Sequence, residues 1–314
     1  MAHRWTRVFA LLLALVVAGV GCRSEPEAVA GAPKEPVAAV EALAGALRDG
    51  DLRRYAELSV PPDLYAQQQT LWRRDVTVAQ IDPEEAERWR SMMTELTAPD
   101  AEEALWAKAQ PRLQALQQQA GPRWTMGVTM MSGFLTAAIA ANPTLSEAER
   151  THAKGLLDAA KTWAGDQTTF TDEARARQAI ATAVQTARSL DLPNLEDAGK
   201  LELEPVLDKA GIAFRGAKSM ATAYGIDVDA ALSQVQAEVI AIDGAKALVR
   251  VRYPLLGETV TFEQPMVQID GGWYRQDAVE SLQASLAEAQ AEDAARSADA
   301  AAATEPLPAP AAAP

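Results

Sequence analysis

The chain has 314 residues, enough for one large or two ordinary domains, and it is acidic, with a formal net charge of −14. Such a charge repels the phosphates of nucleic acids, so we expect no nucleic-acid partner. One cysteine, Cys22, and two histidines, His3 and His152, exclude an internal disulfide, a cysteine-ligated metal and a multi-histidine metal site. We therefore expect neither a metal nor a cofactor.

The first 21 residues have the pattern of an export signal, because arginines precede an apolar run at 8–17 and small residues follow it. The ending Gly19-Val20-Gly21-Cys22 resembles the lipobox of bacterial lipoproteins, with Gly19 where that family usually has Leu. The resemblance implies that residues 1–21 are a removed signal peptide. It also implies that Cys22 becomes the lipidated first residue, which attaches the protein to a membrane.

The lipoprotein resemblance also implies a location. Arg23 follows Cys22, whereas an aspartate at that position is associated with retention in the inner membrane. We therefore expect an exported protein that faces the periplasm, with the outer membrane favoured over the inner membrane. Loss of residues 1–21 removes two arginines and makes the chain more acidic, so lipid and not charge must hold it to the membrane.

Residues 22–36 are rich in Pro, Ala and Glu and predict a flexible tether, after which a single mixed domain is expected over 37–288. Apolar residues at helical spacing over 37–47 predict a first helix that ends at Gly50. A second short helix follows from Asp51 and stops at Pro61-Pro62.

A helical block is expected over 63–195, where Ala, Gln, Glu and Leu dominate and helix-start signals recur. The predicted helices cover 63–75, 83–96, 100–119, 123–141, 146–163 and 171–189. Residues 124–141 carry no charge, and a helix of that length reaches ~27 Å, close to the ~30 Å hydrocarbon thickness of a bilayer. Two interpretations stay open for this helix: a buried central helix, favoured by its glycines and threonines, or a membrane segment.

An antiparallel sheet is expected over 235–276, with a hairpin turn at Asp243-Gly244, one apolar face, and arginines on the other face. The fold class is therefore mostly helical α+β, with an Ala-rich helical block packed against a small C-terminal sheet. Residues 289–314 are rich in Ala, Pro and acids and predict a disordered tail.

The first helix, the Gly50-Asp51-Leu52 step and the closing Asp270-Gly271-Gly272-Trp273-Tyr274 resemble the cone-shaped domains of the nuclear-transport-factor-2-like superfamily. The resemblance covers residues 37–62 and 205–280. It implies a pocket between the curved sheet and the helices. Members of that superfamily include both binding modules and enzymes, so the resemblance implies no single activity.

Three residues of the sheet are candidate ligand contacts: Arg250, Arg252 and Trp273. Arg250 and Arg252 project from one strand face and would suit a carboxylate or a phosphate. The alternative is that they pair with acids of the sheet, such as Glu238, Glu258 or Glu263, and this alternative is favoured.

The remaining chemistry-bearing side chains favour structural roles. His152 lies on an acidic helix face and is expected to be exposed to solvent and not catalytic. Met126 and Met130 share a helical face that is expected to be core and not a soft-metal site. Six tryptophans could stack on sugars or aromatic ligands, but filling the core of an Ala-rich bundle is favoured for them; they are Trp72, Trp89, Trp106, Trp124, Trp163 and Trp273.

No set of residues identifies a reaction, and no catalytic residue is assigned. The sequence therefore predicts a lipid-anchored envelope protein that acts as a binding or scaffold module, with a possible protein partner in the envelope. The alternative is an envelope hydrolase or isomerase that uses a pocket between the sheet and the helices, with carboxylates or His152 as the base.

Overall fold

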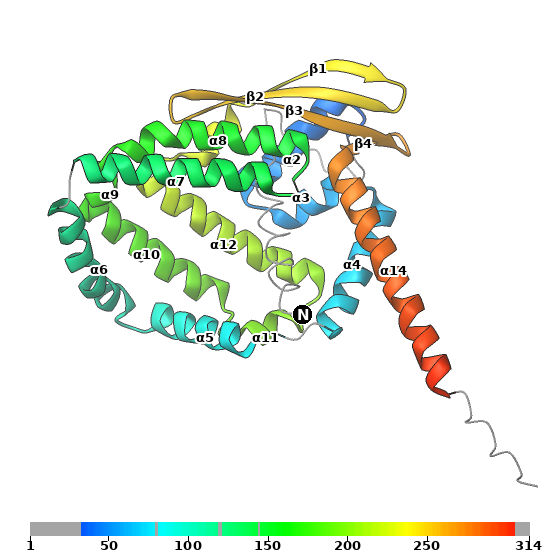
Figure 1. Cartoon of the computed structure of the whole chain (residues 1–314), viewed down its shortest axis with the longest axis horizontal. Helices are drawn as coiled ribbons and strands as arrows, with labels where there is room; N and C mark the ends of the chain where they lie inside the picture. Colours follow the sequence, from blue (N-terminus) through cyan, green and yellow to red (C-terminus); the bar gives the residue numbers. More distant parts are fainter. Residues whose placement is uncertain (1–32, 79–80, 119–120, 144, 305–314) are drawn as a thin grey trace, which may run out of the picture.

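The computed structural model describes residues 33–78, 81–118, 121–143 and 145–304 (Figure 1). The predicted signal peptide, Cys22 and most of the tether lie outside the described residues. The described chain is mostly helical and carries a four-stranded antiparallel sheet near its C-terminus, which confirms the predicted fold class.

The N-terminal helices α2 (Pro36–Asp49) and α3 (Leu52–Ser59) are separated by a tight cap. Gly50 has a φ of 68°, and its N–H donates to the carbonyls of Ala46 and Leu47. The side chain of Asp51 accepts from the backbone N–H of Arg54 and starts α3. Local capping therefore sets the angle between these helices, as the sequence predicted.

The helical block follows the predicted spans, because each span has a local start signal and an apolar period. Asp82, Ser146 and Asp172 cap α5, α8 and α10. The helices are α4 (Pro62–Val78), α5 (Pro83–Thr97), α6 (Ala101–Gln118), α7 (Pro122–Ala141), α8 (Glu147–Gly165), α9 (Gln167–Thr171), α10 (Glu173–Leu190), α11 (Leu195–Ala198), α12 (Leu203–Ala223) and α13 (Val228–Ser233).

The sheet is an antiparallel meander in the order β1-β2-β3-β4. Its strands are β1 (Gln236–Asp243), β2 (Lys246–Leu255), β3 (Glu258–Ile269) and β4 (Gly272–Arg275). The first hairpin turns at Gly244, with a φ of 56°, and the last at Asp270 and Gly271, with φ of 51° and 80°. Sequence and structure therefore agree on the hairpins.

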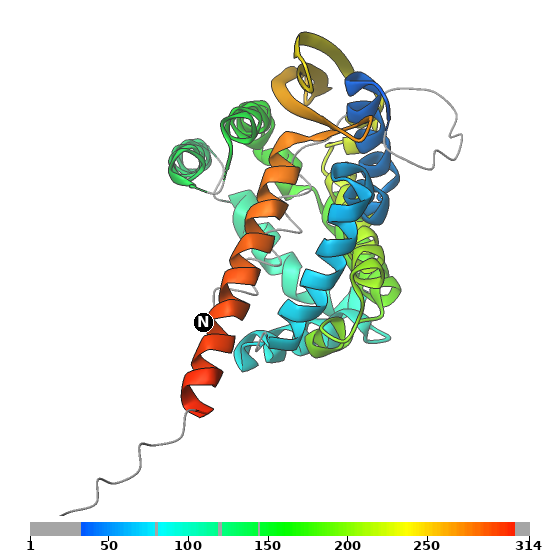
Figure 2. The same cartoon turned by 90° about the vertical axis from the view of Figure 1, so that its right-hand side faces the viewer.

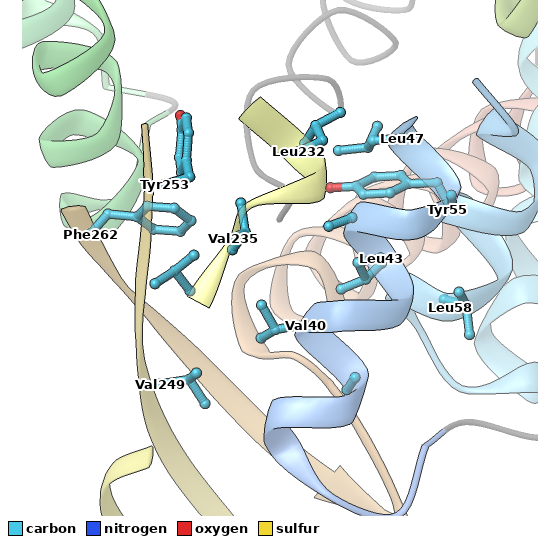
Figure 3. Close-up of a cluster of buried hydrophobic side chains, with 14 of the residues drawn as sticks. Val40, Leu43, Leu47, Tyr55, Leu58, Leu232, Val235, Val249, Tyr253 and Phe262 are labelled. Carbon is cyan, nitrogen blue, oxygen red and sulfur yellow. The ribbon is translucent and has the colours of Figure 1, made fainter. Parts of the chain in front are cut away.

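The apolar face of the sheet covers one end of the helical block, above α2 and α8 (Figure 1). Figure 3 shows Val40, Leu43 and Leu47 of α2 pointing toward the strands that carry Val249 and Phe262. This packing positions α8 directly against β3.

The C-terminal helix α14 (Gln276–Thr304) corrects the predicted tail boundary at residue 289. Ala289 is buried, and Arg74 of α4 donates to its carbonyl at 3.2 Å. Arg74 also pairs with Glu292 at 2.8 Å and with Asp293 at 3.3 Å. High helix propensity and these contacts continue the helix past residue 289. Residues 305–314 lie outside the described residues.

Helix α7 also departs from expectation. Its segment Arg123–Ala141 has a mean hydropathy of 1.3, yet none of it is buried within the structure. It packs against α8 and stands at the outer edge of the body (Figure 2). The favoured interpretation as a buried central helix is therefore wrong, and Met126 and Met130 are not core residues.

Candidate functional site

The most concentrated group of buried ionisable side chains lies where α8 crosses the sheet. Ser146 and Glu149 form a capping box that starts α8, and Gly155 lets this helix approach Val260 of β3. His152 follows on the same face of α8 and is only 2% exposed. The expectation that His152 is exposed is wrong, because its helical phase and not its acidic neighbours decides its direction.

His152 contacts two aromatic side chains of the sheet. Its Nε2 atom lies 2.6 Å from the hydroxyl of Tyr253, and its ring stacks on Phe262 with centroids 4.1 Å apart. In the described residues its Nδ1 atom has no hydrogen-bond partner. Burial, with a smaller contribution from the positive charge of Arg275, lowers the pKa of His152 to about 4. Burial raises the pKa of Tyr253, so both groups are neutral at pH 7.

Arg275 of β4 is the centre of a buried ionic group beside His152. It donates to the hydroxyl of Tyr55 at 2.6 Å and through Nε to Asp277 at 3.1 Å, and Glu149 lies 3.6 Å away. Burial alone would lower the pKa of Arg275, but the oxygens of Tyr55, Asp277 and Glu149 outweigh that effect and raise it. One guanidinium therefore links α3, α8, the sheet and α14.

This cluster has the ion pairs and hydrogen bonds of a structural core. The space between the sheet and α2, where the sequence places a pocket, is filled in the described residues by side chains such as Val40, Leu43 and Val249 (Figure 3). A general base must reach its substrate, and His152 lies under this packing. We interpret the cluster as a set of ion pairs and hydrogen bonds that holds the sheet against the helices.

The candidate ligand residues of the sheet do not come together. Trp273 is 5% exposed within the core, whereas Arg250 and Arg252 lie on the opposite face of the sheet. Arg250 lies 3.3 Å from Glu238 and 3.1 Å from Glu263. Arg252 lies 2.6 Å from Glu238. The arginines thus pair with acids of the sheet, as the favoured alternative states, and the acids in these pairs are Glu238 and Glu263.

The tryptophans mainly join helices. Trp106 is buried, and the guanidinium of Arg177 lies 3.9 Å from its ring centroid. Four indole N–H groups donate at 2.9–3.0 Å to backbone carbonyls distant in sequence, which fits a packing role. The pairs are Trp72 with Leu201, Trp89 with Leu192, Trp124 with Ala164, and Trp163 with Tyr224. Among the described residues, no group of three or more His, Cys, Asp or Glu side chains is arranged to hold a metal.

An apolar cleft of about 420 Å³, largely open to solvent, lies in the helical block between α6 and α10. Its walls are Leu, Ala and Ile side chains, including Leu113 of α6 and Ala179 and Ile180 of α10. Arg112 and Tyr224 add polar groups to this lining. Sequence reasoning missed this cleft, because an alanine stripe facing a leucine stripe is also what two packed helices require. This cleft is the candidate binding site.

No protein-family model matches the chain, and neither a curated protein nor a solved structure is similar to it. The resemblances to lipoproteins and to the nuclear-transport-factor-2-like superfamily therefore stay predictions from the sequence.

Proposed function

We propose that this protein is a lipid-anchored protein of the bacterial envelope that faces the periplasm and acts as a binding module. The proposed location depends on the predicted signal peptide and on lipid at Cys22, and the outer membrane is favoured over the inner membrane. Its role as a binder rests on the cleft between α6 and α10. The alternative, an envelope hydrolase or isomerase, requires a pocket at the place where apolar side chains fill the described structure.

The cleft suits an amphiphile with an apolar body and one acidic group. The cleft is largely open to solvent, and its apolar walls would bind an apolar ligand by removing one side of its surface from water. Arg112 is the cationic side chain of this lining and can donate two parallel hydrogen bonds to a carboxylate. The proposed ligand is therefore a medium-chain fatty acid or a compound of the same chemistry.

Fluorescence titration with a dansyl-labelled undecanoic acid, and with its uncharged methyl ester, tests this assignment. We expect Ala179→Trp to fill the cleft and weaken binding of both probes by at least about tenfold, since steric exclusion removes the apolar contact. Arg112→Gln should weaken binding of the acid several-fold and leave the ester unaffected.

Two variants serve as matched controls. Ala107→Trp adds the same bulk at an exposed position of α6 outside the cleft lining, and Arg88→Gln removes a cation that is 68% exposed on α5. Both should bind like the parent. Absence of saturable binding, or equal loss in Ala179→Trp and Ala107→Trp, would remove the cleft as the binding site.

A further inference from the structure

Helix α7 exposes an unusual amount of apolar side chain. Met126, Met130 and Phe134 are 63%, 70% and 68% exposed, and Met131 is 58% exposed. With Leu135, the helix carries five of the nine large apolar side chains that are exposed in the described residues. Contiguous apolar surface of this kind marks a site that another molecule or a membrane covers.

The helix is apolar around its whole circumference. No charged residue lies between Trp124 and Ala141, and a helix of this composition is normally buried on all sides. The hydroxyls of Thr129 and Thr136 donate to carbonyls of their own helix, at 2.9 and 2.8 Å. These hydroxyls therefore need no water, and α7 can enter an apolar medium without leaving them unsatisfied.

The position of α7 favours contact along a membrane surface over a crossing. The helix forms a convex edge, with α8 between it and the sheet (Figures 1 and 2). It packs along α8, whose exposed side chains include Glu147, Lys154, Asp158 and Lys161. Crossing the hydrocarbon would take these charges with it at high cost. If α7 lies in the membrane–water interface, only its outer face is exposed to lipid.

The N-terminal tether keeps a bilayer within reach. The backbone N–H of Trp273 in β4 donates to the carbonyl of Pro33 at 3.0 Å, so Pro33 is held at the edge strand of the sheet. Ten residues lie between Cys22 and Pro33, and a chain of that length spans at most about 40 Å. Lipid on Cys22 would therefore keep the sheet end of the body within about 40 Å of the bilayer, a distance at which α7 can turn toward the membrane surface.

We propose that α7 inserts its outer face, centred on Met130 and Phe134, into the interface of the bilayer to which the protein is anchored. This inference rests on the proposed lipid anchor for the choice of membrane. The protein is acidic, so anionic lipid would not attract it. The contact is therefore apolar and does not require anionic lipid. The occupant is the phospholipid surface itself.

Flotation with phosphatidylcholine vesicles tests the contact, with the processed chain of residues 22–314 carrying Cys22→Ser, so that no acyl chain contributes. We expect this chain to float with the vesicles. Met130→Glu should weaken the partition by about tenfold or more, since a carboxylate on the outer face must then be desolvated. Ser219→Glu adds the same charge at an exposed position of α12 and should float like the parent. Adding phosphatidylglycerol should not strengthen binding.

Three results would overturn the proposal: a parent chain that does not float, equal flotation of Met130→Glu and the parent, or binding that requires phosphatidylglycerol. Sedimentation equilibrium without vesicles supplies a further outcome. A dimer that Met130→Glu dissociates would show that a second copy covers α7. Because the tested chain lacks the acyl chains, its result is independent of Cys22 acylation, which metabolic labelling tests separately.

Discussion

His152 is buried, although its neighbours in sequence are polar and acidic. Its ring is enclosed by Phe262 and Tyr253, and the positive charge of Arg275 lies beside it. Protonation would place a second cation in this cluster and remove the capacity of Nε2 to accept a hydrogen bond. The folded protein therefore holds His152 neutral, with a pKa of about 4 against 6.5 for an ordinary histidine.

This lowered pKa predicts a loss of stability in acid. Between pH 6.5 and 4 the unfolded chain binds the proton that folded His152 refuses, so the free energy of unfolding falls as the pH falls through this window. Above pH 6.5 none of this free energy of unfolding is lost. The total loss on going to low pH is about 3 kcal/mol. In His152→Gln we expect lower stability at pH 7 but a shallower decline toward pH 4. Urea unfolding at several pH values measures both, and parallel pH profiles for the two proteins would refute the assignment.

At the scale of elements, two glycines mark how differently helices are packed in this molecule. Gly216 of α12 lies against α10, where an added Cβ would come within 2.2 Å of the Oγ1 atom of Thr186 and 2.8 Å of its Cβ. Gly133 of α7 has no neighbour within 4 Å of such a Cβ. The backbone of α12 is therefore packed closely against side chains of α10, whereas α7 has an open face.

The same substitution should consequently have opposite effects at these two positions. Gly216→Ala forces α10 and α12 apart, and we expect it to lower the free energy of unfolding by about 1–3 kcal/mol. Gly133→Ala adds helix propensity without a clash and should raise it by about 0.5–1 kcal/mol. Urea unfolding monitored by far-ultraviolet circular dichroism compares them directly. Stabilisation by Gly216→Ala would contradict the close packing.

At the scale of the whole molecule, the two ends of the chain help to hold the body together. Arg74 of α4 holds α14 along the side of the body, and Pro33 is hydrogen-bonded to β4 at the sheet, so both contacts join segments far apart in sequence. The N-terminal residues that precede Pro33 would connect this body to a membrane through lipid on Cys22. Anchor, tether and α7 would then act together, with the acyl chains supplying most of the affinity.

Metabolic labelling with palmitate tests the anchor. In an expressing bacterium we expect the wild type to take label and to sediment with membranes. Cys22→Ser should lose the label and shift in part from the membrane fraction to the soluble fraction, because only the weaker attachment through α7 remains. Ser24→Ala leaves the cysteine in place and should behave like the wild type. A wild type that never takes label would remove the lipid anchor from the proposal.

Local features of this fold could be predicted from the sequence because each depends on neighbours within a few residues. Gly50 caps α2 through its own positive φ, Ser146 and Glu149 cap α8 reciprocally, and Asp243-Gly244 turns the first hairpin. The alternation along β2 likewise predicted a sheet with one apolar face. These signals determined the elements, their order and the fold class.

Only the tertiary structure decided which faces are covered. His152 became buried and Met130 exposed because the angle and distance at which α7, α8 and the sheet pack depend on contacts between distant segments. The same packing separated Trp273 from Arg250 and placed an apolar cleft between α6 and α10. Hydrophobic burial is non-directional, so an apolar stripe shows that a face needs a partner without showing which partner covers it.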